Sequence, residues 1–209
     1  MPILKLQTEG KDQAWAYWQI QESEEELAYL AQQTCPDEII FSQKRLEWLA
    51  GRALIRKLTE QCGLEYLGLR KDEFGKPFLK NHPHHISLSH SFPMVAAQIA
   101  LKHPVGIDIE QPKPKLKAIA HRMFSPEEVE DAGDDLVKLC IYWCAKEALY
   151  KIYGKRNLLF TDHLHILPFT LLTDGAIKGM IKGNFETLNV DLQYFVMDEF
   201  ILVVTQSVI

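Results

Sequence analysis

The sequence predicts an α+β fold in which helices are followed by a β-rich stretch twice along the chain. Two long segments, Ser42–Gly63 and Asp135–Tyr153, have the length and apolar spacing of helices. Each precedes several short segments rich in β-branched and aromatic residues. The 209 residues, 47% of them hydrophobic, suffice for one large domain or two small ones. We expect two halves, residues 1–103 and 104–209.

The first half is expected to begin with an aromatic-rich strand at Ala14–Ile20 and a short helix at Glu24–Gln33. Ser42 is the expected N-cap of the long helix. The arginines of this helix share one face, which we interpret as solvated surface: Arg45, Arg52 and Arg56. Strands are expected at His85–Ser89 and Val95–Leu101.

The second half is expected to open with a short buried strand at Val105–Glu110. Ser125, Pro126 and Glu128 form a helix start with a capping box. The next helix should end at Gly154. The expected later strands are Ala176–Ile181, Asp191–Val196 and Phe200–Gln206, with bends at Gly175, Gly179 and Gly183.

Composition argues against several classes of function. The net charge of −5 does not favour a nucleic-acid partner. No apolar run is long enough to cross a bilayer, and the N-terminus does not resemble a signal peptide. We therefore expect a cytoplasmic protein without a membrane partner. Its four cysteines should be free thiols.

Two carboxylates share one side of a predicted strand. Asp108 and Glu110 are two residues apart, so both side chains point the same way. Their mutual repulsion would be relieved by a divalent cation, and oxygen ligands favour Mg²⁺, Mn²⁺ or Ca²⁺ over zinc. The alternative is that the strand ends at Ile109 and both acids are hydrated.

A third carboxylate lies on the second long helix. Trp143, Glu147 and Lys151 are spaced i, i+4, i+8 and form one column. An acid that binds metal beside a lysine that binds phosphate would suit a metal-bound polyphosphate. An ordinary Glu–Lys surface pair is the alternative. Ser89 and His90, at a predicted strand end, suit phosphate binding or local turn hydrogen bonds equally well.

Taken together, these segments resemble the 4′-phosphopantetheinyl transferase superfamily, in its larger single-chain, surfactin-synthetase-activating type. The resemblance extends from Ser42 to Lys151. Its segments, in the family's order, are Gly51-Arg52, Phe74-Gly75-Lys76-Pro77, Ile86–Ser91, Gly106–Glu110 (GIDIE), Phe124–Glu128 and Trp143–Lys151 (WCAKEALYK). The GIDIE and W-x-x-K-E-A-x-x-K pair is the most specific part.

The resemblance implies a pseudo-dimer of two similar α+β halves, each with a long helix packed on a small antiparallel sheet. Coenzyme A would be the substrate, bound in an active-site cleft between the halves. The C-terminal half would carry the metal site, with Asp108, Glu110 and Glu147 as ligands of Mg²⁺ or Mn²⁺. Lys151 would contact the phosphates of coenzyme A. The residues expected to hold the nucleotide and its phosphates are Lys76, Ser89, His90 and, less directly aligned, Arg45.

The implied reaction transfers 4′-phosphopantetheine from coenzyme A to a serine of an acyl or peptidyl carrier protein and releases adenosine 3′,5′-bisphosphate. Glu147 would act as general base, directly or through water. The basic segment Lys113–Lys117 is a candidate contact for an acidic carrier. Glu127 matches an acidic position near the metal, and helix capping explains it equally well. A monomer is expected. The alternatives are a magnesium-dependent phosphohydrolase and an inactive module that binds carrier protein or coenzyme A.

Overall fold

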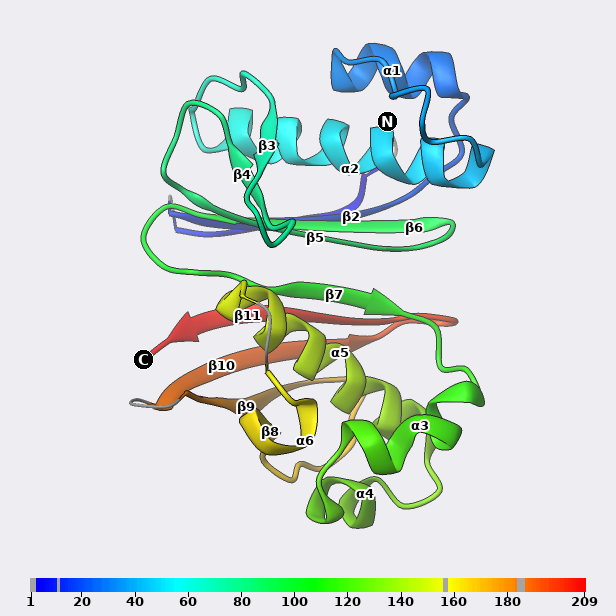
Figure 1. The fold of residues 1–209 in the computed structure, drawn as a ribbon, viewed down its shortest axis with the longest axis vertical. Helices are drawn as coiled ribbons and strands as arrows, with labels where there is room; N and C mark the ends of the chain where they lie inside the picture. Colours follow the sequence, from blue (N-terminus) through cyan, green and yellow to red (C-terminus); the bar gives the residue numbers. More distant parts are fainter. Residues whose placement is uncertain (1–2, 11, 156–157, 184–186) are drawn as a thin grey trace. The chain divides into compact units, whose positions relative to one another are not determined.

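A computed structural model describes residues 3–10, 12–155, 158–183 and 187–209. Contacts divide the chain into two compact units, Met1–His103 and Pro104–Ile209. Each unit combines helices with an antiparallel sheet, so the predicted α+β class is confirmed at that level (Figure 1). Among the described residues, no helix is both long and apolar enough to cross a membrane.

The first unit is built on a four-stranded antiparallel sheet in the order β1-β2-β6-β5. Its strands are β1 (Ile3–Glu9), β2 (Gln13–Gln19), β5 (His85–Ser91) and β6 (Met94–Ala100). Helix α2 (Ser42–Gln61) packs against β2, β5 and β6, and α1 (Glu24–Ala31) packs on α2 (Figure 1). A small hairpin joins β3 (Leu69–Lys71) to β4 (Pro77–Leu79).

Helix α2 forms because its apolar residues recur on one face. Leu49, Leu54 and Leu58 are fully buried against the sheet. Phe41, and not Ser42, occupies the N-cap position, and it makes no side-chain capping bond. The predicted Ser42 cap is therefore wrong, because Ser42 is already the first helical residue. The burial of this face fixes the rotation of α2 over β5.

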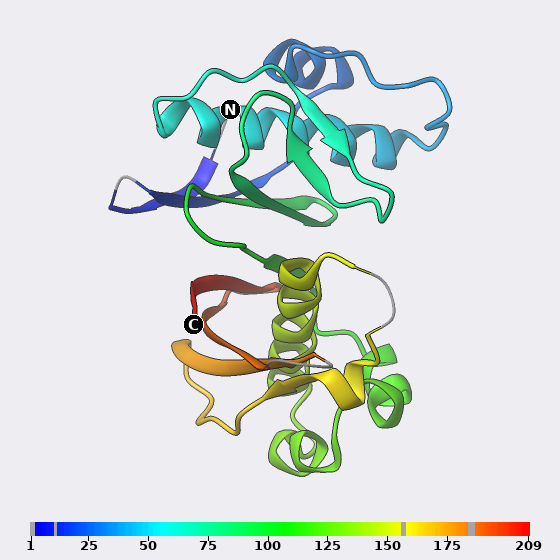
Figure 2. The ribbon, with the colours of Figure 1, turned by 60° about the vertical axis from the view of Figure 1, so that its left-hand side comes forward.

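The second unit has a five-stranded antiparallel sheet in the order β7-β11-β10-β9-β8. Its strands are β7 (Ile107–Glu110), β8 (Leu164–Ile166), β9 (Asp174–Lys182), β10 (Thr187–Val196) and β11 (Ile201–Val208). Helix α5 (Leu136–Tyr153) packs against this sheet, which curves around it in Figure 2. The shorter helices are α3 (Lys115–Met123), α4 (Pro126–Ala132) and α6 (Phe160–His163).

The predicted ends of the helices in this unit are largely confirmed. Ser125 and Glu128 form the capping box of α4. Asp135 caps α5 by accepting hydrogen bonds from two backbone amides, and Gly154 ends it in the left-handed conformation. Fixed ends set the register of α5, and so decide which of its residues face β7.

Two of the predicted glycine bends are wrong. Gly175 and Gly179 lie within β9. A Cβ atom at Gly175 would lie 2.9 Å from the Tyr194 ring, and one at Gly179 would lie 3.0 Å from Leu149. These glycines therefore allow close packing instead of a change of direction. The cysteines are free, as predicted.

Candidate active site

The carboxylates of β7 lie on a buried strand. Ile107, Asp108 and Ile109 are all buried, with Asp108 only 3% exposed, and Glu110 is half-buried. Asp108 lies opposite Val203 of β11 in an antiparallel ladder. The alternative of two hydrated acids beyond the strand is therefore wrong, because β7 continues through Glu110.

Gly106 brings helix α5 directly against the start of β7. A Cβ atom at Gly106 would lie 2.0 Å from the Ala148 carbonyl oxygen, which no side chain could tolerate. Thr205 of β11 holds the same residue, since its Oγ1 accepts a hydrogen bond from the Gly106 amide at 2.9 Å. The glycine of the GIDIE segment therefore sets the spacing between helix and strand.

Lys151 connects the helix to the carboxylates of the strand. Its Nζ donates to Asp108 Oδ1 at 2.7 Å and to the Ile107 carbonyl oxygen at 2.7 Å. The Lys151 side chain is 25% exposed and that of Asp108 is 4% exposed. The Lys151 side chain is therefore partly open to solvent, while its carboxylate partner is buried.

Glu147, one turn before Lys151, shares this electrostatic environment. Burial and the negative charge of Asp108 raise the pKa of Glu147 to about 7, although the Lys151 ammonium opposes the shift and Glu110 adds to it. The three predicted metal ligands are thus close enough for their charges to interact. The alternative of an ordinary surface pair is wrong, because Lys151 pairs with Asp108.

The chemistry of these donors fits a hard divalent cation. Three carboxylates supply only oxygen, which favours Mg²⁺ or Mn²⁺. Within the described part of the chain, no three His, Cys, Asp or Glu side chains are already gathered as a metal-binding group. The set of donors therefore supports a metal proposal by its chemistry and charge coupling.

A buried ion pair, not predicted from the sequence, supports α5 on the side of Lys146. Lys146 is 0% exposed, and its Nζ lies 2.6 Å from Glu128 Oε2. The same ammonium donates to the carbonyl oxygens of Met123 and Phe160, each at 2.9 Å. Burial lowers the pKa of Lys146, and Glu128 opposes that shift. Lys146 therefore links α5 to the start of α4 and to α6.

Glu128 completes this network beyond its capping role. Its Oε1 accepts a hydrogen bond from the Ile166 amide of β8 at 2.8 Å, while Oε2 also accepts from the Ser125 amide. The neighbouring Glu127 is exposed, and a hydrogen bond from Ser125 is the main cause of its lowered pKa. A capping box could be predicted from the sequence, but its partners on β8 and α5 are tertiary contacts.

The residues predicted to hold the nucleotide belong to the first unit. Ser89 is buried and His90 exposed near the end of β5, and Lys76 is half-buried with a pKa lowered mainly by burial. Arg45 is held internally. Its Nε and Nη2 donate to Glu24, and its Nη1 donates to the carbonyl oxygens of Pro36 and Ile39.

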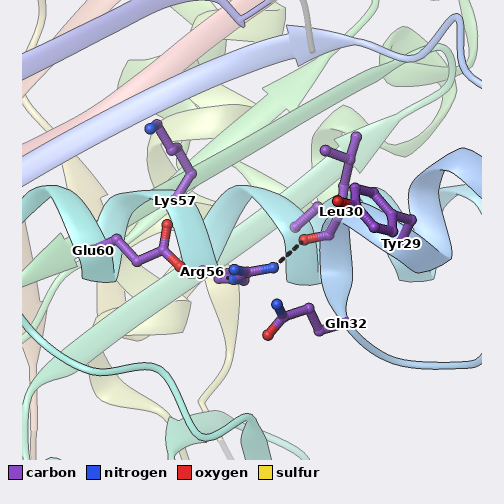
Figure 3. A pocket seen from close by; sticks show the side chains of 7 residues that line it. Tyr29, Leu30, Gln32, Arg56, Lys57 and Glu60 are labelled. Atoms are coloured by element: carbon purple, nitrogen blue, oxygen red, sulfur yellow. Dashed lines mark hydrogen bonds and ion pairs between the residues drawn. The ribbon is translucent and has the colours of Figure 1, made fainter.

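The arginine face of α2 is therefore not simple solvated surface, and that interpretation is wrong. Arg52 lies with its guanidinium carbon 3.3 Å from the centroid of the Trp48 ring. Arg56 borders a hollow of about 280 Å³ between α1 and α2, lined also by Tyr29 and Lys57 (Figure 3). Arg56 donates to Glu60 at 2.8 Å and to the Leu30 carbonyl oxygen at 3.1 Å.

A family model described as the 4′-phosphopantetheinyl transferase superfamily matches residues 104–204, which include β7 and α5. Residues 104–204 of this chain therefore resemble this superfamily. The matched region contains the three carboxylates, Lys151 and the buried Lys146–Glu128 pair. The family resemblance predicted from the motifs is thus confirmed.

Curated proteins similar to this chain are also named as 4′-phosphopantetheinyl transferases. A Bacillus subtilis 4′-phosphopantetheinyl transferase is 35% identical over 147 residues, which are 66% of this chain and 64% of the relative. Psf-1 of Bacillus pumilus is 35% identical over 51% of this chain and 49% of its own length. Sfp of Bacillus subtilis strain 168 is 34% identical over 62% of this chain and 60% of its own length. The chain thus spans about half to just under two thirds of these relatives.

Proposed function

We propose that this protein transfers the 4′-phosphopantetheine group of coenzyme A to a serine of an acyl or peptidyl carrier protein and releases adenosine 3′,5′-bisphosphate. The observation that carries the proposal is the group formed by three charge-coupled carboxylates and the Lys151–Asp108 ion pair. Such a group suits a polyphosphate substrate, because phosphoryl transfer depends on charge neutralisation and positioning.

Asp108, Glu110 and Glu147 are the residues that would hold Mg²⁺, with Mn²⁺ as a substitute. The ion, when bound, would neutralise and polarise the pyrophosphate of coenzyme A. Lys151 stabilises negative charge on the departing phosphate. Glu147 accepts the proton of the attacking carrier serine, either itself or through water.

The nucleotide end of coenzyme A is assigned to Lys76, Ser89 and His90 of the first unit. We propose that the two units are related halves of a pseudo-dimer, with the active-site cleft between them. Each unit does place one long helix on an antiparallel sheet, which supports this assignment. A chain that already contains both halves would act as a monomer, and we place it in the cytoplasm.

The proposed carrier contact lies at the start of α3. Lys113, Lys115 and Lys117 are all exposed, and Lys115 is the first residue of the helix. Two of these lysines, Lys115 and Lys117, are therefore helical. An acidic carrier would be attracted to this basic surface even though the whole chain carries a net charge of −5.

The experiment that tests the function combines the protein with an apo-carrier protein, coenzyme A and Mg²⁺, followed by intact mass measurement of the carrier. We expect the mass of the carrier to rise by one phosphopantetheine group. Cleavage of coenzyme A without any carrier would indicate a phosphohydrolase. Binding of coenzyme A with no transfer to acyl or peptidyl carriers would indicate a binding module.

A further inference from the structure

A buried carboxylate in the first unit lies beneath a lysine and a histidine side chain. Glu47 of α2 has a side chain that is only 2% exposed. Lys44 Nζ donates to Glu47 Oε2 at 2.6 Å, and His90 Nδ1 lies 3.3 Å from the same oxygen. Gln43 Nε2 donates to Glu47 Oε1 at 3.1 Å. Both carboxylate oxygens therefore have partners.

The fold determines this arrangement. Lys44 and Gln43 lie one turn before Glu47 on α2, so they reach its carboxylate from the same helix. His90 comes from β5, against which α2 packs. Lys44 and Gln43 hydrogen-bond to Glu47, and His90 adds positive charge. Together these outweigh burial, which alone would raise the pKa of Glu47, so that this pKa is lowered. Glu47 is therefore an ionised buried group that joins a helix to a strand.

The cluster of Glu47, Lys44 and His90 has its carboxylate inside and its two nitrogen-bearing side chains at the surface. The Lys44 side chain is 54% exposed and that of His90 is 46% exposed, whereas Glu47 lies inside. A carboxylate next to Nδ1 fixes the orientation of an imidazole ring, as buried acids do behind catalytic and metal-binding histidines. One buried anion thus holds an ammonium and an imidazole in fixed positions on the outer side of the unit.

Arg45 has a different set of partners. Glu24, Pro36 and Ile39 already engage its guanidinium, and none of them belongs to the His90 cluster. Lys44 precedes Arg45 by one residue and is joined to His90 through Glu47. A ligand held by His90 would therefore meet the ammonium of Lys44.

We infer that Glu47 is a positioning residue that holds Lys44 and His90 as a phosphate-binding pair for coenzyme A, with Lys44 in the role that the sequence assigned to Arg45. This inference rests on the proposed function and names residues of its nucleotide site. A fixed lysine and imidazole offer donors to a phosphate at lower entropic cost than two mobile side chains.

Glu47→Gln removes the negative charge of the cluster, and the direction in which the Kd of coenzyme A changes tests the inference. If Glu47 only contributed charge, Glu47→Gln would tighten binding of an anion. If Glu47 positions both cations, the same change weakens binding, because a neutral amide holds two cations poorly. We expect the Kd of coenzyme A, measured by calorimetry with Mg²⁺, to rise about tenfold in Glu47→Gln. An unchanged or lower Kd would overturn the inference.

A double-mutant cycle separates positioning from loss of structure. In a Lys44→Gln, His90→Gln background, Glu47→Gln should raise the Kd of coenzyme A by less than twofold, because the residues it positions are gone. A full additional tenfold loss would contradict positioning. Lys44→Gln and His90→Gln change exposed side chains, so they also test the pair if Glu47→Gln does not fold. Unchanged Kd values in both would overturn it.

The matched control is Glu60→Gln, which removes the carboxylate of an exposed ion pair with Arg56 on the same helix. Its Kd for coenzyme A should equal that of the parent. A tenfold rise in Glu60→Gln as well would show a general effect of charge on α2 and refute the specific role of Glu47. Coenzyme A lacking the 3′-phosphate identifies the phosphate, since the Glu47→Gln effect should vanish if that group is the one bound and persist if the pyrophosphate is.

The two proposals can fail separately. A parent protein that binds coenzyme A with Kd values independent of Lys44, Glu47 and His90, yet modifies a carrier, would refute this inference alone. A parent that modifies no carrier but loses affinity for coenzyme A in Glu47→Gln would refute the transferase proposal and keep the phosphate-binding pair.

Discussion

A Cβ atom on Gly106 would lie 2.0 Å from the carbonyl oxygen of Ala148. The backbone of α5 is therefore in direct contact with the chain entering β7. Glu147 precedes Ala148 on the helix, and Asp108 follows Gly106 by two residues. This contact consequently sets how near the carboxylate of the helix lies to those of the strand.

Gly106→Ala should lower the free energy of unfolding by about 1–3 kcal/mol, because the methyl group forces α5 away from β7. It should also weaken Mg²⁺-dependent binding of coenzyme A. Urea denaturation and calorimetric titration measure the two effects. Gly51→Ala is the control, since its Cβ would lie an ordinary 3.5 Å from Leu88 within a helix. That change should keep stability or raise it by up to about 1 kcal/mol. Equal losses in both variants would contradict the special role of Gly106.

Glu147→Gln should reduce the transfer rate about 100-fold or more, because the amide neither accepts the serine proton nor binds a divalent cation as a carboxylate does. Stopped assays with carrier mass as the readout measure the rate. The fold should persist, as judged by circular dichroism and thermal melting. Glu130→Gln on α4 changes an exposed acid and serves as the control. Near-normal turnover of Glu147→Gln would refute its assignment.

Asp108→Asn should abolish the stabilisation that Mg²⁺ and coenzyme A together give the parent, since ligands that bind only the folded state raise its melting temperature. The sequence alone predicts that loss of one acid relieves repulsion. The structure adds the pairing of Asp108 with Lys151, so the variant should instead be less stable without metal. Melting curves with and without both ligands test this, with the exposed Asp174→Asn as control. If Mg²⁺ and coenzyme A raise the melting temperature of the variant as much as that of the parent, Asp108 is not a metal ligand.

Lys146→Met should lower the free energy of unfolding by about 3–5 kcal/mol, because it leaves Glu128 buried without its ion-pair partner. The double variant Lys146→Met, Glu128→Gln should lose less than the sum of the two single variants. Chemical denaturation of the parent, both single variants and the double variant gives the coupling energy. Strict additivity would show that the pair does not act as a unit.

His85 should add a contribution to stability that rises with pH where it titrates, opposite in sign to that of Glu147, whose raised pKa makes stability fall as pH rises from about 4.5 to about 7. Burial, with the nearby charges of Lys76, His103 and His84, lowers the pKa of His85. Below the unfolded-state value of about 6.5, the unfolded chain therefore binds more protons at His85 than the folded one, and this contribution falls as pH decreases. Denaturation midpoints from about pH 5 to about pH 8 measure the slope. His85→Gln should make this slope less positive than in the parent, and an unchanged slope would rule His85 out as a contributor.

The local signals of the sequence predicted much of the fold. The capping box at Ser125 and the stop at Gly154 depend on contacts within a few residues, and both are confirmed. Gly175 and Gly179 gave a wrong prediction, because a glycine that admits a neighbouring side chain looks the same in sequence as one that bends a strand. The local sequence does not show how closely side chains from other elements approach a residue.

The candidate site shows the same division. The i, i+2 and i, i+4 spacings predicted that Asp108 and Glu110 share a face and that Glu147 and Lys151 share a column. They could not show that Lys151 pairs with Asp108, across 43 positions of the chain. Glu47 was missed because a glutamate within a helix gives no sign of burial. Its spacing to Lys44 indicates an ordinary surface pair, and only the packing of α2 on β5 brings His90 to it.

The pairing of Lys151 with Asp108 and with the Ile107 carbonyl oxygen also implies selectivity by competition. Any phosphate that approaches this ammonium meets the negative charge of an internal carboxylate that is already paired with it. A weakly charged ligand gains too little to overcome that repulsion, whereas a polyphosphate accompanied by a divalent ion offers both a stronger anion for the lysine and a cation for the acid. The ion pair would thus act as a threshold that admits only ligands bringing both charges at once.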